Sequence, residues 1–136
     1  MEHFADLVNC QLTLFNETVI QCDDLDALCD RMYEKAGEIL GAAPDEAVNV
    51  AREISKQLPV MFKDHERLEQ RINELRKELE DLHDAQCFCM IYWSSRDMLV
   101  QMIQRLPALD KLVISLGENL ESLKQDLVNL CAAESD

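Results

Sequence analysis

The residues best suited to chemistry are cysteines and histidines, and one group of them is closely spaced. Cys87 and Cys89 flank Phe88, and His83 lies four residues before Cys87. On a helix, residues two apart point about 200° apart, so both thiolates cannot reach one ion. Structural zinc sites also need a second ligand pair, which Cys131 or His83 could supply only through folding that the sequence does not show. A catalytic thiol needs an oxyanion donor and an orienting group, and neither is readable here. We therefore predict no metal, no cofactor and no catalytic residue.

Glycine is too rare for most ligand-cradling loops. The chain has only Gly37, Gly41 and Gly117, whose spacing cannot form a dinucleotide-binding loop, a P-loop or a Gly-x-Ser-x-Gly elbow. Such sites need backbone amides that approach the ligand closely. The sequence therefore predicts that the protein is not an enzyme.

The cysteines and the N-terminus indicate a compartment. The first residues lack the cationic stretch and apolar core of a secretory signal, and the longest apolar run has seven residues, too few to span a membrane. We predict a cytoplasmic protein, with the nucleus as the alternative, that is neither secreted nor inserted into a membrane. Thiols in that setting stay reduced and act as small apolar residues. The chain has six: Cys10, Cys22, Cys29, Cys87, Cys89 and Cys131.

An acidic cluster occupies the N-terminal segment, at Asp23, Asp24, Asp26 and Asp30. A calcium loop would need a glycine at its sixth position, and none is in place. Residues 1–50 carry 11 acidic and 2 basic residues, and the whole chain has a net charge of −14. This balance disfavours nucleic acid and anionic membranes as ligands. The cluster is either a solvated helix face or a docking strip for a basic protein surface.

Residues 3–40 show the apolar spacing of a long helix. Positions three and four apart form a heptad seam with flanking apolar residues, wider than two strands need, so this helix should face more than one other helix. The seam comprises Phe4, Val8, Gln11, Phe15, Thr18, Cys22, Leu25, Cys29, Met32, Ala36 and Ile39. Gly41 and Pro44, followed by Asp45 and Glu46, predict a stop and a new start, hence an antiparallel hairpin. A helix over residues 44–58 follows, and Pro59 either ends or kinks it.

Residues 60–94 carry the strongest periodicity, from Met61 and His65 onward over roughly five heptads. The seam positions between 68 and 82 are all leucine or isoleucine, set among charged residues, as in a coiled coil. We predict that these residues contact a partner helix: Leu68, Ile72, Leu75, Leu79 and Leu82. A helix of about 33 residues rises roughly 50 Å, so we expect an elongated molecule.

The remaining helices are predicted at residues 96–106 and 108–132, around Pro107, with Ser94-Ser95 either a loop or part of a helix. A leucine stripe in the last helix supplies four further partner-contact candidates: Leu116, Leu120, Leu123 and Leu127.

Residues 87–93 are apolar on every side of a helix. Each large side chain left in water would forfeit about 1.5–3 kcal/mol. Either the neighbouring helices wrap this run inside one bundle, or it docks a partner subunit. On the second interpretation the contact residues are Phe88, Tyr92 and Trp93, of which the last two are types favoured at binding hot spots.

Together these patterns predict an all-α fold: one elongated antiparallel helical bundle or coiled coil over residues 1–136. We predict a non-enzymatic structural subunit of a multi-protein coiled-coil complex, whose partners are other helical proteins, with a hetero-complex favoured over a homodimer. On periodicity alone, the chain resembles in style small helical subunits of cytoskeletal, spindle, kinetochore or organelle-positioning complexes. The alternative is a self-contained helical-bundle adaptor that binds short motifs.

Overall fold

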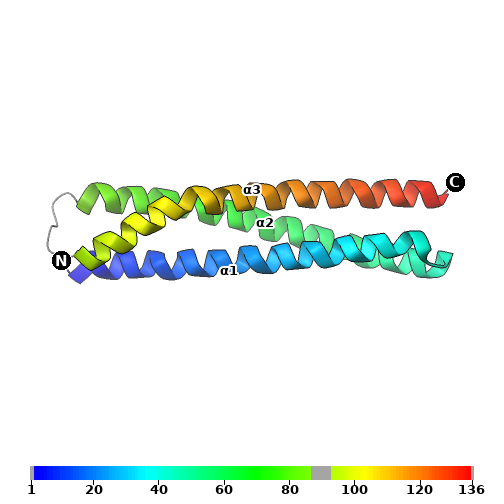
Figure 1. Ribbon diagram of the computed structural model, residues 1–136, viewed down its shortest axis with the longest axis horizontal. Helices are drawn as coiled ribbons and strands as arrows, with labels where there is room; N and C mark the ends of the chain where they lie inside the picture. Colours follow the sequence, from blue (N-terminus) through cyan, green and yellow to red (C-terminus); the bar gives the residue numbers. More distant parts are fainter. Residues whose placement is uncertain (1, 87–92, 136) are drawn as a thin grey trace. The chain divides into compact units, whose positions relative to one another are not determined.

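The computed structural model describes residues 2–86 and 93–135, and nearly all of them are helical (Figure 1). Helix α1 spans Glu2–Glu38, a short 3-10 helix η1 spans Ile39–Gly41, α2 spans Pro44–Gln86 and α3 spans Trp93–Ser135. The described residues contain no strand, and the helices pack against one another. The predicted all-α helical bundle is therefore confirmed.

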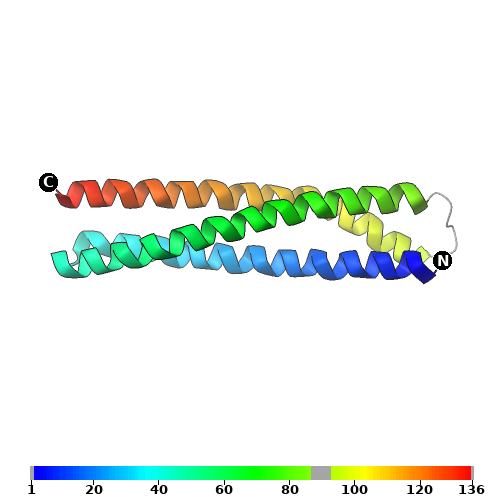
Figure 2. The ribbon, with the colours of Figure 1, turned by 180° about the vertical axis from the view of Figure 1, so that it is seen from behind.

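The connection between α1 and α2 lies where the sequence predicted it, and Figure 2 shows it from behind. The α-helix tightens into η1, and the Ala42 amide donates to the carbonyl of Ile39 at 3.4 Å. No described glycine has a positive φ, so Gly41 ends the helix without a left-handed residue. Pro44 is the first residue of α2, with Asp45 and Glu46 in its first turn. Proline at this position has no amide to leave unpaired, and the two carboxylates meet the positive end of the helix dipole.

Both internal prolines lie inside continuous helices. Pro59 lies within α2 and Pro107 within α3, so the four helices predicted around them join into two. Each proline is exposed and has buried apolar residues close by on either side. The sequence alone could not settle this outcome, because packing of the residues on both sides of a proline can offset the free-energy cost of the hydrogen bond that the proline removes. Ser94 and Ser95 likewise belong to α3 rather than to a loop.

The predicted helix at 60–94 is described only in part. Helix α2 continues to Gln86, and the next described helix, α3, begins at Trp93. Residues 87–92 of the prediction lie outside the described residues.

The chain divides into two compact units, and each helix contributes a portion to both. Unit 1 comprises Met1–Cys22 and Arg67–Val113, and unit 2 comprises Asp23–Glu66 and Ile114–Asp136. Each unit has its own core of apolar side chains from α1, α2 and α3. The expectations of a single elongated unit and of coiled-coil geometry stay predictions.

The core of unit 1 follows the predicted spacing closely. From α1 it contains Phe4, Val8, Phe15 and Cys22, and from α2 Leu68, Ile72, Leu75, Leu79 and Leu82. From α3 it contains Leu99, Met102, Leu106, Leu109 and Val113. Thr18 is also fully buried here, and its hydroxyl donates to the carbonyl of Leu14 at 2.7 Å. That bond satisfies a polar group in an apolar seam without interrupting the helix.

Polar contacts connect all three helix pairs of unit 1. Arg71 of α2 donates to the side-chain oxygen of Gln21 on α1 at 3.2 Å. The Arg105 guanidinium of α3 lies 4.9 Å from the ring centroid of Phe15 on α1. Arg76 of α2 pairs with Asp110 of α3 at 3.2 Å. Each of these contacts involves at least one partly or fully exposed side chain and contributes about 1 kcal/mol or less, so the apolar core supplies most of the stability of unit 1.

Unit 2 has the same plan. Its core contains Leu25, Cys29, Met32 and Ala36 from α1, Ile39 from η1, Ala47, Ile54, Leu58 and Met61 from α2, and Leu116, Leu120, Leu123 and Leu127 from α3. Lys35 pairs with Glu53 between α1 and α2. The Tyr33 hydroxyl donates to the backbone carbonyl of Asn119 at 2.9 Å between α1 and α3. Lys124 of α3 lies 5.8 Å from the Phe62 ring centroid of α2.

Gly117 of α3 makes room for the imidazole of His65 on α2. A Cβ atom added at Gly117 would lie 2.7 Å from Nε2 and 2.8 Å from Cε1 of His65. No side chain fits there unless the imidazole moves. His65 was a polar residue on the predicted seam, and its half-buried position depends on this glycine.

We predict that Gly117→Ala stabilises the protein by clearly less than the roughly 1 kcal/mol that alanine gains over glycine in a helix. The new methyl group must displace His65. In a His65→Ala background the full gain should return, because the obstacle is gone. Urea denaturation of the two single variants and the double variant measures this coupling. Equal gains in both backgrounds would show that the imidazole moves aside at no cost.

Candidate protein-interaction surfaces

The seam residues predicted to contact a partner lie in the cores of the two units. In unit 1, Leu68 is 3% exposed and Leu75 is 1% exposed, and the rest of that set is similarly covered. In unit 2, the α3 leucines at 116, 120, 123 and 127 are also buried. These nine side chains therefore pack against the chain's own helices. A partner that binds the folded bundle would meet other residues, unless a helix separated and was replaced.

The side chains of the other three partner-contact candidates are not described by the structure. Phe88 and Tyr92 lie outside the described residues, as do Cys87 and Cys89. Trp93 begins α3, but the structure does not describe its side chain. In the part of the chain that is described, no group of three His, Cys, Asp or Glu residues could hold a metal ion.

The predicted acidic strip lies on α1 in unit 2. Asp23, Asp24 and Asp30 are exposed, and Asp26 is half-buried. Within residues 2–86 and 93–135 no basic side chain pairs with any of the four. Unit 2 holds 16 acidic and 6 basic residues, against 11 and 7 in unit 1, so its net charge is −10 against −4. The four carboxylates of the strip thus lack basic partners among the described residues and lie in the more acidic of the two units.

Cys29 lies in the core beneath this strip and is a free thiol. Burial raises the pKa of the Cys29 thiol, and the carboxylates of Asp30 and Asp26 raise it further. A thiol whose pKa is higher in the folded state stays neutral there at a pH where the unfolded chain is ionised. The stability from Cys29 is therefore complete at pH values below the pKa of its thiol in the unfolded chain, and it falls as the pH rises toward the higher pKa of the folded state.

We predict that iodoacetamide at pH 8 labels the exposed Cys10 and Cys131 much faster than Cys29. The thiolate is the reactive form, and Cys29 is both covered and kept protonated. Peptide mapping by mass spectrometry at successive times measures the rates, and labelling in urea supplies the unfolded control. Comparable rates for Cys10 and Cys29 in the folded protein would contradict this burial.

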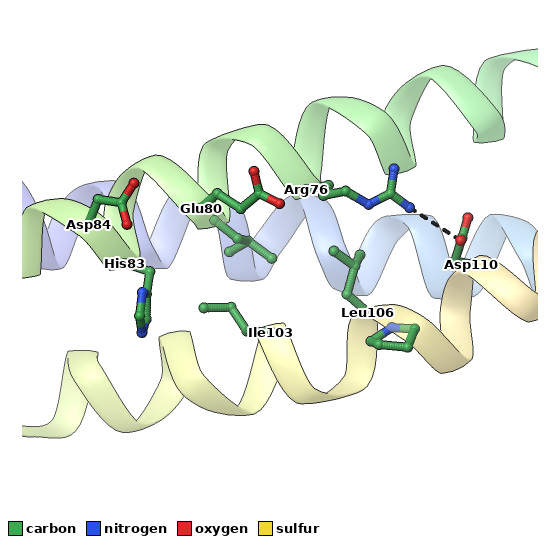
Figure 3. Close-up of a pocket in the computed structure, with 9 residues that line it drawn as sticks. Arg76, Glu80, His83, Asp84, Ile103, Leu106 and Asp110 are labelled. Carbon is green, nitrogen blue, oxygen red and sulfur yellow. Dashed lines mark ion pairs between the residues drawn. The ribbon is translucent and has the colours of Figure 1, made fainter.

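A groove of about 520 Å³ lies between α2 and α3 within unit 1. The lining residues of α2 recur at intervals of three and four, so they lie on one face of that helix. The lining residues of α3 recur in the same way and also share one face. Figure 3 shows His83 pointing from α2 toward α3 and Ile103 pointing back toward α2. The lining residues are Arg76, Leu79, Glu80, His83, Asp84, Ile103, Leu106, Pro107 and Asp110.

Of the charged residues around this groove, some form an ion pair and others have no partner of opposite charge among the described residues. Arg76 pairs with Asp110 at 3.2 Å, with the two side chains 39% and 40% exposed, and it also donates to the Asn73 side chain at 2.9 Å. Glu80 and Asp84 are exposed and have no basic partner among the described residues. The groove therefore combines an apolar interior with two uncompensated carboxylates at its edge.

Unit 2 has a smaller and more apolar groove of about 380 Å³, near the connection between α1 and α2. It is lined by Ile39, Pro44, Ala47, Val48, Ala51, Arg52, Ser55 and Cys131. Val48 is half exposed, and several other large apolar side chains also face solvent: Ile20, Leu40, Val60, Ile114 and Val128.

Sequence reasoning missed both grooves and these exposed residues. Its seam positions described what each helix buries, not where two packed helices leave a gap. One signal was present: apolar residues such as Ile114 and Val128 lie off the predicted seams.

Comparison with protein-family models, with curated proteins and with solved structures found no match to this chain. Among the described helices, none has an apolar stretch long enough to cross a membrane.

Proposed function

We propose that this protein is a non-enzymatic structural subunit of a multi-protein helical complex, of the cytoskeletal, spindle, kinetochore or organelle-positioning type. It would act through packing of its helices against helices of other proteins. The supporting observation is the division of apolar side chains into two sets. The leucine stripes form the cores, while a second set stays exposed on outer helix faces: Ile20, Leu40, Val48, Val60, Ile114 and Val128.

The charge supports hetero-assembly. A chain with a net charge of −14 repels its own copies, whereas a basic protein surface complements it. Asp23, Asp24, Asp26 and Asp30 are the candidate docking strip for such a surface. The same charge disfavours nucleic acid as a partner. We propose the cytoplasm as the compartment, with the nucleus as the alternative, in keeping with the free thiol of Cys29 in the core of unit 2.

A second candidate is a self-contained adaptor for short motifs. It is favoured by the burial of the predicted partner-contact leucines, because a bundle that covers its own seams needs no partner to fold. The two functions differ in how the purified chain behaves. An adaptor should be a stable folded monomer of 15.6 kDa, whereas an obligate subunit should aggregate or unfold without its partners.

The deciding experiment is gentle purification of the tagged chain from its native cells, followed by size-exclusion chromatography with light scattering and mass spectrometry. We expect the chain in a particle well above 15.6 kDa, with other helical proteins at fixed stoichiometry. Elution as a monomer without stoichiometric partners would contradict the subunit proposal. A folded monomer that binds short peptides would support the adaptor instead.

A further inference from the structure

We propose that the groove between α2 and α3 in unit 1 docks an amphipathic helix of a partner protein, one that carries lysine or arginine beside its apolar stripe. This inference rests on the proposed function, because it names the surface and the kind of helix through which the chain would join a complex.

The shape of the groove suits a helix. On α3, the lining residues Ile103, Leu106, Pro107 and Asp110 follow the spacing i, i+3, i+4 and i+7, so they form one face. The lining residues of α2 repeat this spacing from Arg76 to Asp84. Two helix faces that border one gap are the arrangement into which a further helix packs its ridge.

The interior of the groove is apolar and partly open. Leu79 and Leu106 are buried, Ile103 is half-buried and Pro107 is exposed. Ile103 and Leu106 both project from α3 toward α2 in Figure 3. Leucine or isoleucine anchors on an incoming helix would cover the exposed parts of Ile103 and Pro107, which the chain itself leaves in water.

The charges around the groove favour particular side chains on either side of the apolar stripe of the incoming helix. Glu80, Asp84 and Asp110 contribute three negative charges, and Arg76 contributes one positive charge. Since Arg76 and Asp110 satisfy each other, Glu80 and Asp84 remain to attract a cation. A partner helix with lysine or arginine next to its apolar residues would complete both pairs.

The same electrostatics disfavour a second copy of this chain as the occupant. The chain carries a net charge of −14, so self-association would bring two acidic surfaces together at the groove. Like charges at an interface are unfavourable and suppress that pairing.

The probe for this proposal is a displayed library of helical peptides of about 18 residues, roughly 27 Å long. Each peptide has leucine or isoleucine at i, i+3, i+4 and i+7, and its flanking positions vary among Lys, Arg, Glu, Gln and Ala. Selection on the immobilised full chain should enrich lysine and arginine at the flanks. Fluorescence anisotropy then gives the Kd of the best peptide in solution.

The matched variants change the same net charge at two places on α2. The double variant Glu80→Lys with Asp84→Lys reverses the charge of two residues that line the groove. The double variant Glu78→Lys with Asp81→Lys reverses the charge of two residues that do not line it. We expect the groove variant to bind the cationic peptide at least about tenfold more weakly, and the control to change by less than about threefold. A peptide with its lysines and arginines replaced by glutamate should bind the groove variant better than the wild type. Circular dichroism checks that every variant keeps its helices.

Three results would overturn the proposal: selected peptides without a cationic preference, equal losses in both charge variants, or no charge-swap rescue. Dimerisation of the full chain that Ile103→Glu abolishes would also overturn it, since a second copy would then cover the groove. A native complex that survives Glu80→Lys with Asp84→Lys would refute this docking site and leave the proposed function intact. A native monomer that still selects cationic peptides would refute the function and keep the groove.

Discussion

Leu75→Asp should destabilise the protein by at least about 4 kcal/mol. Leu75 is 1% exposed in the core of unit 1. Truncating a buried leucine to alanine already costs about 2–5 kcal/mol, and aspartate adds the cost of a charge in an apolar core. A loss of this size is comparable to the whole stability of an ordinary domain. We expect urea denaturation, followed by far-ultraviolet circular dichroism, to show a large fall in midpoint or an unfolded chain.

The matched control is Val60→Asp, which places the same residue on the same helix at a position that is 53% exposed. Surface substitutions of this kind change stability by about 0.5 kcal/mol. An unchanged midpoint for Leu75→Asp, or equal effects at the two positions, would contradict the core described for unit 1. If the groove or any other surface of unit 1 binds a partner, Leu75→Asp should abolish that binding too, because the surface needs a folded unit.

The same variant tests whether residues 1–136 behave as one unit. Leu75 belongs to unit 1, whereas Leu120, which is fully buried, belongs to unit 2. If the units unfold together, Leu75→Asp and Leu120→Asp should each remove the whole helical signal in a single transition. If they unfold separately, each variant should leave a transition that belongs to the other unit.

The sequence predicted which residues the helices bury, and the reason is the regularity of the spacing. Every seam position named within residues 3–40, from Phe4 to Ile39, is buried, including the polar Gln11 and Thr18. The leucines and isoleucine between 68 and 82 are buried as well. A helix fixes 100° per residue, so apolar residues at intervals of three and four must share a face wherever the helix is continuous.

The same spacing could not say what covers that face. A heptad seam reads identically whether it packs against another chain or against its own neighbours. A partner role for Leu68 or Leu120 therefore stays a prediction, and within this chain other helices already cover both residues. The groove depends on how far α2 and α3 separate around Ile103 and Pro107, and no one-dimensional pattern encodes that separation.

The most informative stabilising change is Pro59→Ala, which should raise the free energy of unfolding by about 2–3 kcal/mol. Pro59 lies inside α2 and is exposed, so alanine restores a backbone donor and relieves the clash of the ring without disturbing the core. Alanine also leaves the unfolded chain more conformational freedom, which removes up to about 1 kcal/mol of the gain. Urea denaturation measures the net effect.

Val60→Ala is the control for this change, since it adds alanine at the next exposed position without removing a proline, and it should shift stability by well under 1 kcal/mol. A loss of stability in Pro59→Ala would mean that the backbone conformation fixed by the proline ring is needed for Leu58 and Met61 to reach the core of unit 2. The sign of this one measurement therefore decides whether the core of unit 2 forms despite Pro59 or because of it.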